Sequence, residues 1–320
     1  MDTFISHSSA LEYWRWLSAE ESYATVKVRN TKLQGRPPVA RSLRTGILSE
    51  LSQPLHVLVG SGKERRKIDG LHCHVWTGQV PENSFYQIAP GLLVCSPEFL
   101  FLLMAKTVSL IRLIVLGFEL CGTYRLGEAK DPSQGMREAK PLTSTVKLAA
   151  YLAKAGASPG IKNALQALKY VGDGSASPME TVLTMMLSLP PRFGGHGLPM
   201  PVLNHHFELP AELREVAGVS GFRCDLAWLP QMIGLEYNSD IYHTAPDRIA
   251  WDALRSNILT GMGITLFTVT KQQVTDPAQL QCLAEDLAKL IGRRLRHNEP
   301  EFSRRHTELR SQLLRKQSRG

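Results

Sequence analysis

The sequence predicts a mixed α/β fold in two domains, and three observations support this prediction. The chain has 320 residues, which suits two domains of ordinary size. Hydrophobic residues make up 43% of it, enough for cores that need no disulfide or structural metal. In the second half, the predicted elements run helix, hairpin, helix, strand, helix, which is a mixed order. We expect a small mixed domain over residues 1–127, a linker over 128–141 and a second domain over 142–298.

The first domain is predicted from a helix start, three strand candidates and an apolar helix. Ser8 and Glu12 have the positions of a serine cap and a first-turn acid. The strand candidates are residues 55–59, residues 71–76 and a segment that ends at Cys95. Ser96 then has the position of an N-cap, and Pro97 suits the first helical position. Glu98 favours the positive end of the same helix.

The most hydrophobic segment, residues 99–120, is expected to be a core helix rather than a membrane span. Lys106 and Arg112 interrupt it, and its uncharged runs are shorter than the ~20 residues that cross a bilayer. The first residues lack the basic and apolar regions of a secretory signal. The five cysteines are scattered without a CxxC pair, which favours a reducing compartment over a disulfide scaffold or zinc site. We therefore expect a soluble, cytoplasmic protein with no membrane partner.

The linker is predicted from composition, because residues 128–141 are polar and lack apolar periodicity. After it, a loop over 172–180 contains the N-cap of a helix, and Pro230 lies in a tight turn between two strands. The expected helices of the second domain are residues 146–155, 161–170, 181–189, 247–259 and 277–296. The expected strands are residues 222–228, 232–238 and 264–269.

Two carboxylates lie on the strands of the predicted hairpin. Asp225 is on the first strand and Glu236 on the second, and both strands are otherwise largely apolar. A carboxylate in such a setting is costly unless it is solvated or binds a cation. Ligands that are all oxygen atoms suit Mg²⁺ better than zinc. Asn238 lies two residues after Glu236, so both side chains point to one face, where they can meet a single scissile phosphate.

These residues carry a resemblance to a known family. Asp225 followed by Glu236-Tyr237-Asn238 resembles the D…E-x-K arrangement of the PD-(D/E)xK nuclease superfamily, and most closely its very-short-patch-repair-like (Vsr-like) endonuclease domain. Further motifs of that pattern are residues 177–180 at a helix start, 223–225, 236–243, 252–255 and 261–263. The resemblance covers about residues 165–275. It implies a restriction-endonuclease-like core sheet flanked by helices.

The resemblance also implies a metal-dependent reaction and a role for each site residue. Asp225 is the central metal ligand, Glu236 is a second ligand, and Glu180 belongs to the metal site by holding a metal-bound water. His243 acts as general acid or base, or contacts the phosphate. The implied cofactor is Mg²⁺, with Mn²⁺ as an alternative, and it lowers the pKa of its water and neutralises charge in the transition state. The residues implied to support the site are Asp252 and Arg255.

The sequence departs from the family pattern where Asn238 replaces the usual lysine. An amide cannot supply a positive charge or take a proton. Vsr-like members also lack this lysine and use histidine chemistry, so His243 could compensate. Taken singly, Glu180 also suits a helix dipole, and Asp252 with Arg255 suits a surface pair. Two hypotheses stay open: a DNA endonuclease in defence, mobile-element biology or repair, and a non-catalytic DNA-binding regulator of antitoxin type with a degenerate nuclease fold.

Positive charge is concentrated in two places. The net charge is +8, and residues 293–320 alone hold nine basic and three acidic residues. A second basic stretch covers residues 27–44. Clustered positive charge favours a phosphate-backbone partner, although either run alone is typical of a solvated helix face or a disordered tail. We expect a basic tail over residues 299–320. Its predicted DNA-binding residues are Arg304, Arg305, Arg310 and Arg315.

The first domain is similar, more loosely, to the AbiEi-type antitoxin region that is often joined to such nuclease domains. The residues that carry this similarity are the strand with His72 and the helix that begins at Ser96-Pro97-Glu98. No clear helix-turn-helix is found, so this domain is expected to dock a protein partner or to position the nuclease. His72 and His74 share one strand face and could bind metal. The sequence shows no third ligand, and a plain strand is the favoured interpretation.

Overall fold

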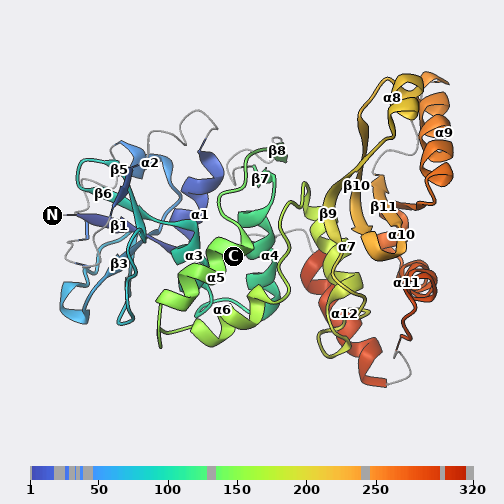
Figure 1. Ribbon diagram of the computed structural model, residues 1–320. Coiled ribbons are helices and arrows are strands. Elements are labelled where there is room, and N and C mark those ends of the chain that lie inside the picture. The colour runs from blue at the N-terminus through green and yellow to red at the C-terminus, as the bar shows by residue number, and fades with distance from the viewer. Residues whose placement is uncertain are drawn as a thin grey trace. The chain divides into compact units, whose positions relative to one another are not determined.

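The chain folds into two units, which divide between Val171 and Gly172 (Figure 1). The computed structural model describes residues 2–17, 26–28, 33, 37–38, 46–127, 135–238, 246–295 and 300–314. Each unit contains a sheet and several helices, which confirms the predicted mixed α/β class. No helix in these ranges is long and apolar enough to cross a membrane.

Unit 1 is built on a six-stranded mixed sheet with the order β2-β5-β6-β1-β3-β4. Its strands are β1 Thr3–Ile5, β2 Val26–Val28, β3 Leu55–Val59, β4 Leu71–Val75, β5 Phe85–Ala89 and β6 Leu92–Cys95. The pairs β1–β6 and β3–β4 are parallel, and the other pairs are antiparallel. The three strand candidates of the sequence correspond to β3, β4 and β6. On β3, only His56 among the five residues is not fully buried, so its Leu and Val side chains belong to the core.

The helices of unit 1 are α1 His7–Trp16, α2 Ile47–Glu50, α3 Pro97–Met104, α4 Leu110–Cys121, α5 Thr145–Lys154 and α6 Ile161–Leu168, with a short 3₁₀ turn η3 at Gly62–Glu64. Three of them, α3, α4 and α5, begin at a serine whose side chain caps the helix. The Ser96 hydroxyl accepts the Phe99 N–H at 3.2 Å, which confirms the predicted N-cap. The N-cap of α1 is Ser6, two residues before the predicted cap. A two-stranded sheet joins β7 Tyr124–Leu126 to β8 Met136–Glu138.

The apolar segment 99–120 is two helices rather than the single helix predicted. The chain turns over residues 105–109, between α3 and α4. Ser109 caps the second helix, because its hydroxyl accepts the Arg112 N–H at 3.4 Å. Hydropathy alone hid this break, because most side chains of both helices are buried.

The predicted domain boundary is also corrected. Helices α5 and α6 contact α3 and α4, so they belong to unit 1 and not to the second domain. Tyr151 on α5 is buried, and its hydroxyl is 2.7 Å from the Ser84 hydroxyl in unit 1. Within the predicted linker 128–141, residues 136–138 form β8. A polar composition indicated a linker, but the apolar faces of the following helices determine where the boundary lies.

Unit 2 contains a four-stranded sheet with the order β12-β11-β10-β9. The strands are β9 Val202–Glu208, β10 Gly221–Trp228, β11 Ile233–Asn238 and β12 Thr265–Thr270. Strands β10 and β11 form the predicted antiparallel hairpin, joined by the 3₁₀ turn η6 Leu229–Gln231, and β12 joins β11 in parallel. The sequence analysis missed β9, whose Asn204, His205 and His206 interrupt the apolar alternation of a strand.

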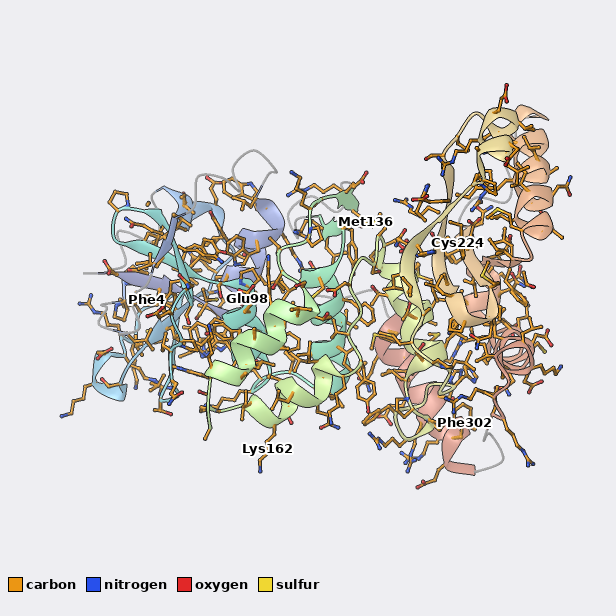
Figure 2. All side chains as sticks on the ribbon, in the orientation of Figure 1. Phe4, Glu98, Met136, Lys162, Cys224 and Phe302 are labelled. Atoms are coloured by element: carbon orange, nitrogen blue, oxygen red, sulfur yellow. The ribbon has the colours of Figure 1, made fainter. Side chains whose placement is uncertain are left out.

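Helices flank this sheet. They are α7 Pro178–Ser188, α8 Ala211–Ala217, α9 Pro246–Gly261, α10 Lys271–Thr275, α11 Pro277–Ile291 and α12 Pro300–Leu314, with a 3₁₀ turn η5 at Pro191–Phe193. Within the unit, α7 and α12 lie on one side of the strands and α9 on the other (Figure 1). A core of Phe207, Phe222, Cys224, Ile258 and Leu259 joins β9 and β10 to α9. Figure 2 draws these side chains and labels Cys224.

The predicted basic tail is largely a packed helix. In α12, the side chains of Phe302, His306 and Leu309 are buried (Phe302 is labelled in Figure 2). The helix contacts η5 and α7, and the His306 ring Nδ1 is 2.7 Å from the Gly194 carbonyl oxygen. The second domain therefore continues to at least Leu314 instead of ending at 298.

Candidate functional site

The β10–β11 hairpin brings Asp225 and Glu236 to one cleft of about 580 Å³. Leu226 on β10 pairs with Leu235 on β11, so each carboxylate residue comes directly next to this pair. The cleft is polar on balance, and the residues that line it come from β10, β11, β12, α9 and the turn before β10. They include Arg223, Asp225, Glu236, Asn238, Trp251, Arg255 and Thr268. The structure thus brings together four of the residues that the sequence analysis selected.

Asp225 is held by the backbone of the neighbouring strand. Its Oδ2 atom accepts the Tyr237 N–H at 2.8 Å. Burial raises the pKa of the Asp225 carboxyl, and this effect outweighs the Tyr237 N–H and the positive charges of Arg223 and Arg255, which lower it. Additional positive charge close to Asp225 would therefore stabilise its ionised form.

Glu180 lies close enough to Asp225 for the charge of Asp225 to raise its pKa. Burial is the larger cause of this shift, since the residue is only 6% exposed. Its position follows from the N-terminus of α7, where the Ser177 hydroxyl accepts the Glu180 N–H at 3.1 Å. The Glu180 Oε2 atom in turn accepts the Ala176 N–H at 2.8 Å and the Asn204 amide at 2.7 Å. Glu180 is adjacent to Asp225 but is not among the residues that line the cleft.

Glu236 forms an ion pair with Arg255 of α9. One guanidinium nitrogen, Nη1, donates to Oε2 at 2.6 Å, and Nη2 donates to Oε1. The two side chains are 20% and 16% exposed, so water screens the pair only partly. Nη2 also donates to the Arg223 carbonyl at 2.9 Å, and the guanidinium lies 5.4 Å from the centre of the Phe222 ring. Arg255, predicted as a supporting residue, directly neutralises Glu236.

Of the remaining predicted site residues, the structure describes Asn238 but not the side chains of His243 and Asp252. Asn238 lines the cleft at the end of β11. His243 lies outside the described residues, as does the side chain of Asp252, although the backbone of Asp252 is part of α9. Their predicted roles stay predictions.

The described carboxylates fit a divalent cation only in part. Asp225 and Glu180 are neighbouring oxygen donors with raised pKa values, and a cation would relieve the repulsion between them. Glu236 does not fit as a ligand in this conformation, because both of its oxygens accept from Arg255. Among the residues that the structure describes, no three His, Cys, Asp or Glu side chains are grouped so that they could hold a metal ion.

Asn204 is a neighbour of the site that the sequence analysis missed. Its backbone has a φ of 49°, in the left-handed region that asparagine tolerates better than most residues. Its amide nitrogen bridges the Gly174 carbonyl at 2.8 Å and the Glu180 carboxylate. An asparagine inside a strand is the one sequence signal that could have indicated such an irregular position.

The predicted DNA-binding arginines do not form one exposed set. Arg310 is 8% exposed and donates to the Val274 carbonyl at 3.2 Å and to the Thr275 carbonyl, so it caps the end of α10 instead of facing a phosphate. Arg305 pairs with Glu301 one helical turn earlier. Arg304 is exposed, and Arg315 lies outside the described residues. The charge run of the sequence concealed a helix with a buried face.

Comparison of the chain with protein families, with curated proteins and with solved structures finds no match. The residues and their geometry alone therefore support a function.

Proposed function

We propose that unit 2 is a Vsr-like endonuclease domain that hydrolyses DNA phosphodiester bonds with the help of Mg²⁺. The observation that carries this proposal is the cleft beside the β10–β11 hairpin, where Asp225 and Glu236 lie with Arg223 and Arg255. Hydrolysis of a phosphodiester needs positive charge against the phosphate and groups that move protons. Arg223 lines the cleft and supplies positive charge, and Asp225 would hold a metal ion whose bound water gives up the proton.

In this proposal Asp225 would hold the metal ion, and Glu180, next to Asp225, would hold a metal-bound water. When bound, Mg²⁺ supplies a water of lowered pKa and neutralises charge on the reacting phosphate. The Glu180 carboxylate is already oriented by the Ala176 N–H and the Asn204 amide, so its position does not depend on the metal. Arg223 attracts and orients the DNA backbone in the cleft, whereas Arg255 is paired with Glu236.

A second candidate function is favoured by the ion pair between Arg255 and Glu236. Because Arg255 neutralises Glu236, and Asn238 stands where the wider PD-(D/E)xK superfamily has lysine, the cleft lacks two features of that superfamily's catalytic sites. A domain with these losses can bind DNA without cutting it, as a regulator of antitoxin type. Binding would then depend on the arginines and not on a metal ion.

Plasmid nicking with Mg²⁺, Mn²⁺ or EDTA separates the two functions. The wild-type protein should nick DNA only with metal, and Asp225→Asn should lower the rate at least ~100-fold, the scale of losing one charge-stabilising group. Glu208→Gln is the matched control, because Glu208 is an exposed acid of the same sheet, 78% exposed and paired with Arg214. It should nick like the wild type.

The opposite results are equally decisive. Binding of DNA without nicking under any metal condition would favour the regulator. Nicking by Asp225→Asn at the wild-type rate would show that Asp225 is not the metal ligand.

A further inference from the structure

Four histidines that the proposed function does not use gather in unit 1. His72 and His74 lie two residues apart on β4, and His56 on β3 is the register partner of His72. Residues two apart on a strand and direct cross-strand partners share one face of a sheet. The fourth, His7, is the first residue of α1, and its ring stacks on the His74 ring with centroids 3.6 Å apart. The fold thus supplies the further ligands that the sequence around His72 and His74 did not show.

Three of these rings have the spacing of imidazoles that share one metal ion. The ring centroids are 5.2 Å apart for His56 and His72, 4.5 Å for His72 and His74, and 5.0 Å for His56 and His74. Imidazole nitrogens bind zinc at about 2.0–2.1 Å, which places the centres of two bound rings roughly 5 Å apart. All three distances are close to this value, but the rings of His56 and His72 and those of His56 and His74 are stacked, with interplanar angles of 14° and 25°.

Charges around the cluster affect which ions it can bind. Burial and the neighbouring histidines lower the pKa of His56 and of His74. Arg65 and Lys106 contribute positive charge near His74, and this charge disfavours a cation as well as a proton. Imidazole is a strong ligand for borderline metals such as Zn²⁺, so an ion of this class is the one expected to bind despite the positive charge.

We propose that His56, His72 and His74 bind one divalent transition-metal ion of the Zn²⁺ class on the outer strands of the unit 1 sheet. His7 acts as a positioning residue, because it is buried against His74 and its Nδ1 atom lies 3.0 Å from the Ser6 hydroxyl. His72 is exposed, which gives an ion access from solvent. Three protein ligands leave a fourth position for water or a substrate atom.

Binding requires a rearrangement of two rings. The His56 Nδ1 and His74 Nε2 atoms are 2.8 Å apart and share a hydrogen bond, so they point at each other and not at a common ion. This agrees with the finding that no three potential ligands among the described residues are positioned for a metal at present. Binding of one ion would therefore require the exposed His72 ring and one ring of the hydrogen-bonded pair to rotate. The bound ion would replace the hydrogen bond between His56 and His74.

The test uses the full-length chain after treatment with EDTA, in an Asp225→Asn background that removes the carboxylate site of unit 2. Titration with Zn²⁺ in a calorimeter should show one site per chain. Zn²⁺ at ~100-fold excess over its Kd should raise the Tm of unit 1 by roughly 5–10 °C. Co²⁺ in place of Zn²⁺ should give the visible absorption of a tetrahedral site with nitrogen ligands.

His72→Gln is the most informative variant, because His72 is exposed and its loss should leave the fold intact. It should weaken Zn²⁺ binding by at least ~10-fold, because mutation of a residue that only hydrogen-bonds to a metal ligand already lowers metal affinity by about that factor. His56→Gln and His74→Gln should do the same, with metal-free melting as the check on folding. His206→Gln, an exposed strand histidine of unit 2, is the matched control and should bind Zn²⁺ normally.

Two results would overturn the proposal: the absence of Zn²⁺ binding, or binding that survives His72→Gln unchanged. Because the experiment reads metal binding in unit 1, its outcome does not depend on whether unit 2 cleaves DNA.

Discussion

The ion pair between Arg255 and Glu236 sets the electrostatics of the candidate cleft at the scale of single residues. Arg255→Met keeps much of the apolar stem but leaves the Glu236 carboxylate largely buried and uncompensated. We expect the free energy of unfolding of unit 2 to fall by roughly 1–3 kcal/mol in EDTA. Addition of Mg²⁺ should raise the Tm of the variant more than it raises the Tm of the wild type, because Glu236 is then available to a cation. Calorimetric melting with and without Mg²⁺ measures both effects.

Arg305→Met is the matched control for this variant. Arg305 and Glu301 form an i,i+4 pair whose side chains are 31% and 59% exposed, so its loss should change stability by no more than about 0.5 kcal/mol. An equal Mg²⁺ response in the wild type and in Arg255→Met would show that Glu236 is not part of a metal site.

The sequence brought forward four residues that line one cleft, but it did not predict the contacts that they make. Asp225, Glu236, Asn238 and Arg255 were selected because their residue types and spacing suit a nuclease, and all four line one cleft. The sequence could not show that Arg255 would pair with Glu236, because the pair depends on how α9 docks against the sheet. Nor could it show that His56 lies beside His72, since this requires the parallel register of β3 and β4.

At the scale of elements, α12 is the clearest difference between the sequence prediction and the structure. Its charges indicated a tail, whereas Phe302, His306 and Leu309 fall at positions i, i+4 and i+7 and form one buried face. That spacing was present in the sequence, but the surrounding arginines drew the interpretation towards DNA. The hairpin was easier to predict, because two apolar strands and a proline-containing turn are a strong local signal.

Leu309→Ala tests whether α12 is part of the core of unit 2. Leu309 is 1% exposed, so its truncation leaves a cavity and should cost about 2–5 kcal/mol of stability. Arg304→Ala on the same helix is the control, because an exposed residue should change stability by less than about 0.5 kcal/mol. Chemical denaturation followed by fluorescence distinguishes them. Equal stabilities of the two variants would show that α12 does not contribute to the core of unit 2.

At the scale of the whole molecule, the two units explain why a boundary drawn from composition was misplaced. Residues 128–141 are polar, but the chain continues after them into α5 and α6, each of which buries one apolar face within unit 1. Burial of an apolar helix face is a tertiary property, and a local scan of polarity does not detect it. The structural division after Val171 instead leaves each unit with its own sheet and its own helices.

This division predicts which fragments of the chain fold. A fragment of residues 172–320 keeps the four-stranded sheet of unit 2 together with α12, so it should melt cooperatively and give dispersed NMR spectra. A fragment of residues 142–298, the domain expected from the sequence, carries α5 and α6 without α3 and α4 and lacks α12. It exposes the apolar faces of two helices and removes Phe302 and Leu309 from the core, so it should aggregate or melt without cooperativity. Calorimetry and heteronuclear NMR of the two fragments compare them directly. Cooperative melting of 142–298 alone would favour the boundary predicted from composition, because only then would α12 be dispensable for the fold of unit 2.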